Sequence, residues 1–108
     1  MSKGVNKEGS VLREKSYAFA IRIVKLAQYL QKDKCEFTLA KQVLRSGTSV
    51  GALIRESEFA QSKPDFLHKL SIALKEANET EYWISLLRDT DLYLGTGIFK
   101  LNKRLFRY

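Results

Sequence analysis

The chain has 108 residues, of which 44% are hydrophobic and 29% charged, and its net charge is +7. This length and composition are typical of one globular domain and exclude a wholly disordered chain. No run of 18 apolar residues is present, so we expect no membrane span. The polar N-terminus has no apolar signal core, and Cys35 is a single cysteine. Both features favour a reducing, cytoplasmic location.

Residues 1–10 are polar and are expected to form a flexible tail, followed by a single domain over residues 11–108. The first expected helix spans residues 11–32 and carries two apolar stripes. One stripe consists of Phe19, Ile23, Leu26 and Leu30, and the other of Tyr17, Ile21 and Val24. Together they cover roughly twice the ~100° arc that a surface helix needs to face one core. We therefore expect the second stripe to be buried against another subunit.

The second expected helix spans residues 38–62, with Thr38 as its N-cap. Gly47 and Gly51 lie in its interior, where each glycine costs about 1 kcal/mol relative to alanine. They fall on the same side as Ala40, which would let another backbone approach closely. A break at Gly47 is the alternative, but the apolar period continues across the glycines and favours one continuous helix.

The third expected helix spans residues 64–91, because Pro64 and Asp65 suit a first helical turn. Its core stripe is expected to comprise Phe66, Leu70, Ala73, Leu74, Ala77, Ile84 and Leu87. Glu81 falls beside this stripe, and a buried carboxylate needs a cation. We expect Arg45 or Arg55 to be that partner, whereas Glu76 and Glu79 are expected on a solvated face.

Residues 94–97 are typical of a helix stop and turn, and a short fourth helix is expected over residues 98–107. Its inward side would carry Ile98, Leu101 and Leu105. No stretch alternates between apolar and polar residues as a strand does. The predicted fold is therefore all-α, an antiparallel up-down-up-down four-helix bundle with a short fourth helix.

No pattern in the sequence indicates an active site. His68 is the only histidine, so any Ser-His-Asp or Cys-His arrangement would have to use it. Asp65 and His68 have the i, i+3 spacing of a metal pair, but bundle di-metal sites take such a pair from two helices. A structural zinc site is excluded by a single cysteine and a single histidine. We therefore expect no enzymatic activity, no metal and no cofactor.

Residues 41–51 and 73–84 resemble a known family. A Gln-x-x-Arg-Ser-x-x-Ser helix is here paired with a Glu-x-Glu-x-x-Ile/Leu helix. This pairing resembles the one found in bacterial four-helix-bundle proteins from intervening sequences of large-subunit rRNA genes. The similarity covers roughly residues 15–93. This family is related in fold to the accessory variability determinant of diversity-generating retroelements.

The resemblance implies an antiparallel four-helix bundle assembled as a homopentamer with a basic surface. In the retroelement relative, that surface engages nucleic acid and a reverse transcriptase. The resemblance also implies a structural polar network that ties helices together. Its members in this chain would be Gln42, Arg45, Ser46, Ser49, Glu79 and Glu81.

The basic excess indicates a polyanionic partner. The candidate contacts with RNA or DNA are Arg22, Lys25, Lys100, Lys103, Arg104 and Arg107. The predicted function is a non-enzymatic homo-oligomer that binds nucleic acid non-specifically. The alternative is a scaffold for another protein, such as a reverse transcriptase, with charge serving assembly and solubility. Tyr82, Trp83 and Leu86 would then form an exposed partner patch.

Overall fold

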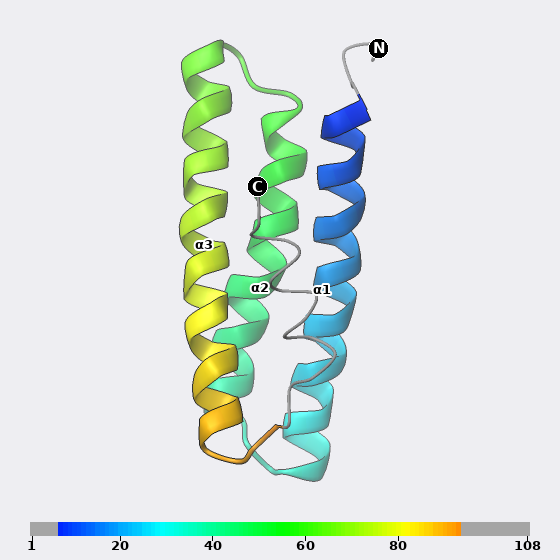
Figure 1. Cartoon of the computed structure of the whole chain (residues 1–108), viewed down its shortest axis with the longest axis vertical. Helices are drawn as coiled ribbons and strands as arrows, with labels where there is room; N and C mark the ends of the chain where they lie inside the picture. Colours follow the sequence, from blue (N-terminus) through cyan, green and yellow to red (C-terminus); the bar gives the residue numbers. More distant parts are fainter. Residues whose placement is uncertain (1–6, 94–108) are drawn as a thin grey trace.

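The computed structural model describes residues 7–93 of the chain. They form three α-helices, α1 (Lys7–Asp33), α2 (Thr38–Ser57) and α3 (Lys63–Asp89). Figure 1 shows that the chain runs down α1, up α2 and down α3, so that consecutive helices are antiparallel. The described residues contain no strand, which confirms the all-α prediction. The expected fourth helix, over residues 98–107, lies outside the described residues, so the four-helix bundle stays a prediction.

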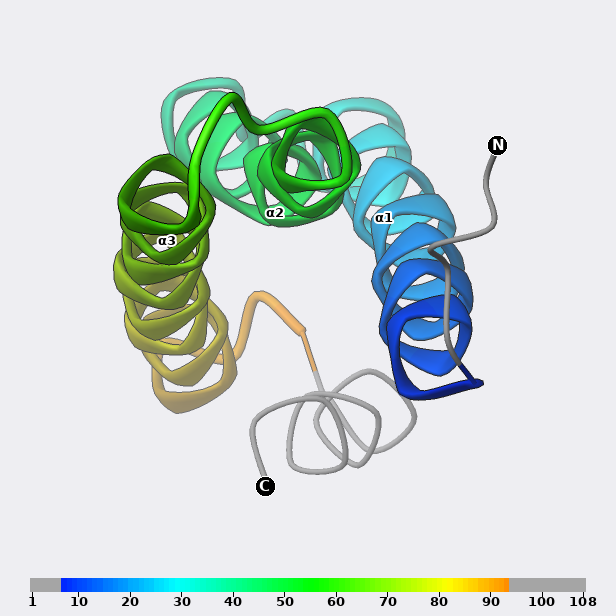
Figure 2. The ribbon, with the colours of Figure 1, turned by 90° about the horizontal axis from the view of Figure 1, so that it is seen from above.

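The three helices are arranged around α2. Its backbone lies close to those of both α1 and α3, whereas the backbones of α1 and α3 do not come close to each other within the described residues. Viewed from above in Figure 2, the helices form an arc with α2 in the middle. Each interface of the described unit is therefore an interface with α2.

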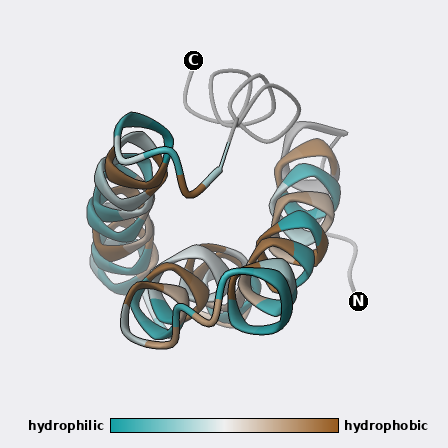
Figure 3. Cartoon of the chain, turned by 90° about the horizontal axis from the view of Figure 1, so that it is seen from below, coloured by the Kyte–Doolittle hydropathy of each residue, from teal (hydrophilic) through white to brown (hydrophobic). Residues whose placement is uncertain are grey.

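The core is built from one apolar side of each helix, and Figure 3 shows apolar and polar positions alternating around the helices. The buried apolar residues are Phe19, Ile23, Leu26, Ala27, Leu30, Ala40, Val43, Val50, Ile54, Ala73, Ala77, Ile84 and Leu87. Burying a large apolar side chain stabilises a fold by about 1.5–3 kcal/mol, so these residues supply most of the stability. The first stripe predicted for α1 is fully confirmed as core.

The apolar stripe predicted for α3 is only partly buried. Leu74 is largely exposed and Phe66 is partly exposed, although both were expected in the core. Leu74 lies at the edge of the stripe, and α2 covers α3 from the other side, through Glu76 and Thr80. Position on a helical wheel alone does not show on which side the neighbouring helix lies.

The two glycines of α2 lie close against α1. A Cβ atom built on Gly47 would lie 2.7 Å from Cγ1 and 2.8 Å from Cγ2 of Ile23. At Gly51 the nearest atom would be the Ser16 carbonyl oxygen, at 3.4 Å, which is ordinary van der Waals contact. The unbroken helix across the glycines is confirmed, and the expected approach of another backbone is found at Gly51, whereas at Gly47 the neighbour is the Ile23 side chain.

The start of α2 is capped differently from the prediction. Thr38 is the first helical residue, and Phe37 occupies the N-cap position without a side-chain hydrogen bond. The Glu36 carboxylate accepts the Leu39 N–H at 2.9 Å instead. Cys35 adopts a left-handed conformation with φ of 51°, which turns the chain between the two helices.

The α2–α3 connection is longer than predicted, because α2 ends at Ser57 rather than at residue 62. Ser62 caps α3 instead, since its hydroxyl accepts the Asp65 N–H at 3.2 Å. At its other end α3 stops at Asp89, two residues early. Asp91 takes the left-handed conformation with φ of 62° there, ahead of the glycines that were expected to stop the helix.

We predict that Gly47→Ala destabilises the protein. Overpacking a core costs about 1–3 kcal/mol, and the gain in helix propensity offsets at most about 1 kcal/mol of it. With the full offset, the expected net loss in the free energy of unfolding is up to about 2 kcal/mol, measured by urea unfolding at fixed protein concentration.

Gly51→Ala is the matched control, because the same substitution there meets only ordinary contact with Ser16. It should be neutral or stabilising by up to about 1 kcal/mol. Equal effects of the two substitutions would contradict the close approach of Ile23 to Gly47.

Candidate functional site

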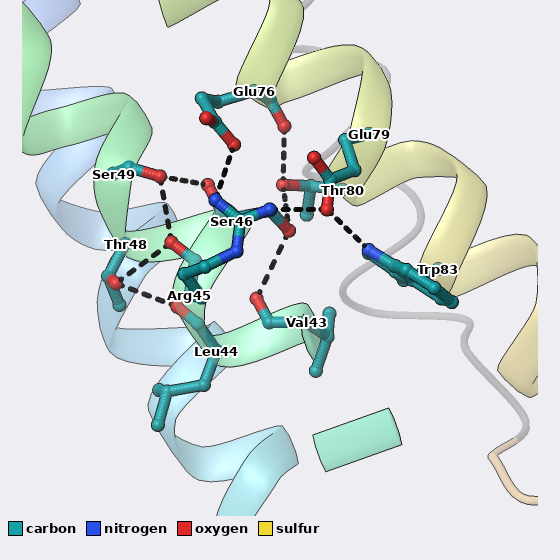
Figure 4. A network of polar contacts seen from close by, with 10 residues as sticks. All are labelled: Val43, Leu44, Arg45, Ser46, Thr48, Ser49, Glu76, Glu79, Thr80 and Trp83. Carbon is teal, nitrogen blue, oxygen red and sulfur yellow. Dashed lines mark hydrogen bonds and ion pairs between the residues drawn. The ribbon is translucent and has the colours of Figure 1, made fainter. Parts of the chain in front are cut away.

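A polar cluster joins the outer sides of α2 and α3 (Figure 4). The Arg45 guanidinium donates to Glu76 Oε1 at 3.1 Å and makes a second, shorter contact with Glu79 Oε2. The Trp83 indole N–H donates to the same Glu79 oxygen at 2.9 Å. Because Glu79 and Trp83 are four residues apart, both stand on one side of α3. Glu79 is thus held by one donor from each helix.

These contacts shift the ionisation of both partners. The hydrogen bond from Trp83, followed by that from Arg45, lowers the pKa of Glu79 below its ordinary value of 4.5. The hydrogen bond to Glu79 raises the pKa of Arg45. Half of the Arg45 side chain is exposed, so solvent screens the pair. Exposed ion pairs of this kind contribute at most about 1 kcal/mol to stability.

A second polar contact lies directly beneath the cluster and is fully buried. The hydroxyl oxygens of Ser46 and Thr80 are 2.9 Å apart, and neither residue is exposed. Thr80 Oγ1 also lies 2.7 Å from the Glu76 carbonyl oxygen. Each hydroxyl has one proton, so one donates to the other and the second donates to a backbone carbonyl of its own helix. If either hydroxyl were removed, the other would keep only a backbone carbonyl of its own helix as its partner.

The structure brings together part of the polar network that the resemblance implied. Arg45, Ser46 and Glu79 do connect α2 with α3. Ser49 donates to the Arg45 carbonyl of its own helix at 2.7 Å, so its hydroxyl does not link helices. Gln42 is half-buried and makes no hydrogen bond to any side chain that the structure describes.

The prediction for Glu81 is wrong. Glu81 is exposed and has no ion pair among the described residues, and Arg45 pairs with Glu76 and Glu79 instead. Two residues correspond to about 200° of turn around a helix, so Glu79 and Glu81 point in nearly opposite directions. Glu79 is the one that faces α2. The buried role of Thr80 was missed, although its place between two apolar core positions indicates it.

The second side of α1 stays uncovered in the described structure. Tyr17 is 58% exposed, Ile21 42% and Val24 38%, and these three residues are called the α1 stripe below. The Arg55 guanidinium of α2 lies 5.6 Å from the centre of the Tyr17 ring, which is cation–π distance. The stripe therefore borders the outer side of α2.

Two of the predicted nucleic-acid contacts fall on the described part of α1. Arg22 and Lys25 are exposed, and neither forms an ion pair with a carboxylate that the structure describes. The other candidates, Lys100, Lys103, Arg104 and Arg107, lie outside the described residues. Among the described residues, the candidate nucleic-acid interface therefore consists of these two side chains on α1.

The residues considered for catalysis or metal binding lie apart. His68 is exposed on α3, and Cys35 is exposed in the α1–α2 connection. Within residues 7–93, no three His, Cys, Asp or Glu side chains gather as metal ligands would. None of the described helices is both long and apolar enough to cross a bilayer.

The described residues are those of a small all-helical protein, in which a buried hydroxyl pair and an Arg–Glu cluster join two antiparallel helices. A family model described as 23S rRNA-intervening sequence protein matches residues 9–105. The chain belongs to this family, which confirms the resemblance seen in its sequence. No match is found among curated proteins.

A solved structure shares the fold over nearly the full length of both chains. It is the crystal structure of a protein of unknown function from the S23 ribosomal protein family of Bacteroides thetaiotaomicron VPI-5482. That protein is 48% identical to this one, with a TM-score of 0.87 over 91% of this chain and 90% of that chain. The function of that similar protein is itself unknown.

We predict that Glu79 makes the stability of the protein depend on acidic pH. Because its pKa is lower in the folded chain, the ionised carboxylate stabilises the fold above the unfolded value of 4.5. This contribution is lost as the pH falls through the folded value. Glu79→Gln should therefore be less stable at neutral pH and lose less stability on acidification, as followed by urea unfolding from about pH 7 to about pH 3.

Glu14→Gln is the control, because it removes the same charge from an exposed position on α1, outside the Arg45 cluster. Trp83→Phe removes the largest cause of the shift and should raise the pKa of Glu79 in an NMR titration. If the wild-type chain and the Glu79→Gln variant lose the same amount of stability as the pH falls, this role for the carboxylate is excluded.

Proposed function

We propose that the protein is a homo-oligomeric helical bundle in the cytoplasm that binds RNA or DNA without sequence preference and catalyses no reaction. The observation that supports it is that α1 presents an exposed apolar stripe together with exposed cations that have no ion pair among the described residues. Self-association would cover the stripe, and the cations would meet phosphates. The family resemblance implies five copies.

The exposed apolar residues support the assembly. Large neighbouring apolar side chains exposed along one helix mark an interaction surface rather than a solvated one. Tyr17, Ile21 and Val24 follow one another along α1, and all three stay exposed although Arg55 lies over the Tyr17 ring. A second copy would remove their apolar area from water.

The charge balance supports a polyanionic ligand. The chain carries a net charge of +7, and assembly multiplies that charge with each copy. Basic residues neutralise phosphates and release condensed counterions, a contribution that carries no sequence information. The description of the family names a ribosomal RNA, which makes RNA the first ligand to test.

We predict that labelled RNA and DNA oligonucleotides bind at low salt and are released as salt rises. The logarithm of the binding constant should fall linearly with the logarithm of salt concentration, by about 0.7–0.9 for each phosphate neutralised. Fluorescence anisotropy on several sequences of equal length measures both the slope and the sequence preference. No binding at low salt would remove the nucleic-acid part of the proposal.

Arg22→Ala should weaken binding to all sequences alike and reduce the salt slope by about one for each phosphate that Arg22 neutralises. Lys75→Ala is the matched control, because it removes the same charge from an exposed position on α3, where acids predominate. Joint replacement of Lys100, Lys103, Arg104 and Arg107 by alanine tests the candidates at the C-terminal end. Equal effects of Arg22→Ala and Lys75→Ala would show that only net charge matters.

One observation favours the second candidate, a scaffold for another protein. Tyr82 is largely exposed and lies edge-on to Trp83, with ring centroids 5.0 Å apart. Trp83 and Leu86 are half-buried, so the patch presents mainly the Tyr82 ring. Tyr82→Ala would abolish capture of a protein partner in this case, and it would leave anisotropy with oligonucleotides unchanged.

A further inference from the structure

A second exposed apolar line runs along α3. Leu67 is 53% exposed and Leu74 58%, and they are seven residues apart, so they lie on one side of the helix. Seven residues further along the same line stands Glu81, which is exposed and has no cationic partner among the described side chains. These three residues are called the α3 stripe.

The α1 stripe and the α3 stripe face different ways. Tyr17 lies against Arg55, so the α1 stripe borders the outer side of α2. Leu74 is two residues from Glu76, which contacts Arg45, and two residues turn a helix by about 200°. The α3 stripe therefore points away from α2. One chain cannot bring its own two stripes together.

The two stripes nevertheless lie at matching heights. Ile23 lies against Gly47, and the neighbouring Ser46 is hydrogen-bonded to Thr80, so the middle of α1 is level with that part of α3. Tyr17 is then level with Leu74, and Lys25 with Glu81. Both helices run in the same direction (Figure 1). A second copy related by rotation about an axis parallel to the helices keeps these levels.

The charges at the stripes are complementary. Lys25 follows Ile21 by one helical turn and borders the α1 stripe, and it is exposed without an ion pair among the described residues. Glu81 ends the α3 stripe at the same height. In a contact between copies, an unpaired cation would meet an unpaired carboxylate beside an apolar seam.

We propose that the α1 stripe of one copy packs against the α3 stripe of a second copy, with Tyr17 against Leu74 and Lys25 against Glu81. The contact joins two different surfaces, so each copy retains one free stripe, and copies add head to tail until a ring closes. This rests on the self-association in the proposed function and specifies its surfaces. It assigns Lys25 to the subunit contact and leaves Arg22 as the α1 cation that faces nucleic acid.

Cross-linking through introduced cysteines distinguishes this contact from others. In a Cys35→Ser background, Ile21→Cys and Asn78→Cys place one thiol within or beside each stripe, at nearly the same height. A short bis-maleimide should join copies of the double variant into a ladder of multimers on a denaturing gel. Each single variant should stay monomeric on the gel, because like positions do not meet in a head-to-tail contact.

A dimer from Ile21→Cys alone would mean that α1 pairs with α1, and a dimer from Asn78→Cys alone that α3 pairs with α3. Either outcome overturns the inference. So does the absence of any ladder from the double variant when light scattering shows that the same protein is oligomeric. Circular dichroism of each variant confirms that the helices are intact.

A charge exchange provides a second, independent test. Lys25→Glu and Glu81→Lys should each weaken association by about fivefold or more in sedimentation, because each places like charges together. The double variant Lys25→Glu/Glu81→Lys should restore association, which a purely structural role for either residue would not produce. Two single variants with wild-type association, or a double variant no better than the singles, overturn the pairing.

The outcomes separate this inference from the proposed function. A wild-type chain that is monomeric at all concentrations removes both the assembly and its surfaces. An oligomer that is indifferent to the cysteine and charge variants removes only the surfaces proposed here. An oligomer with the expected cross-links but no affinity for oligonucleotides keeps these surfaces and removes the nucleic-acid role.

Discussion

One turn of α2 sets the positions of both neighbouring helices. Gly47 has no side chain, and this lets Ile23 of α1 occupy the space where a Cβ would be. The adjacent Ser46 points about 100° further round the helix and meets Thr80 of α3. The heights of α1 and α3 are thus fixed relative to each other although the backbones of the two helices do not come close within residues 7–93. A shift of either neighbour along α2 would cause a steric clash or break the buried hydrogen bond between Ser46 and Thr80.

The Arg45 cluster and the Ser46–Thr80 pair act on the same interface with different strengths. A typical hydrogen bond contributes about 0.5–1.5 kcal/mol to stability, so the buried Ser46–Thr80 contact favours this register over others. The Arg45 contacts with Glu76 and Glu79 are partly exposed and contribute less. Their position above the hydroxyl pair shields it from water, and the bond from Trp83 keeps Glu79 ionised and aimed at α2. The cluster therefore adds orientation and pH dependence to a register that the buried pair determines.

Apolar periodicity was sufficient to predict the helices and the core side of α1, and the unbroken period across Gly47 predicted a continuous α2. It did not predict which carboxylate faces α2. The wheel places Glu81 beside the apolar stripe, but the side on which α2 packs is a tertiary property, and it selects Glu79. Helix ends also depended on particular hydrogen bonds. Ser62 is equally compatible with the end of α2 and the start of α3, and only its bond to the Asp65 N–H decides between them.

Charge and assembly are linked in the proposed function. Each copy carries a net charge of +7, so an assembly accumulates positive charge, and this opposes association where screening is weak. A local pairing such as Lys25 with Glu81 favours the contact but does not cancel the net repulsion. A polyanion that lies across several copies does cancel it, because it neutralises cations on more than one subunit. Thermodynamic reciprocity then requires that an oligonucleotide which binds the assembly more tightly than the single chain also strengthens the association of the subunits.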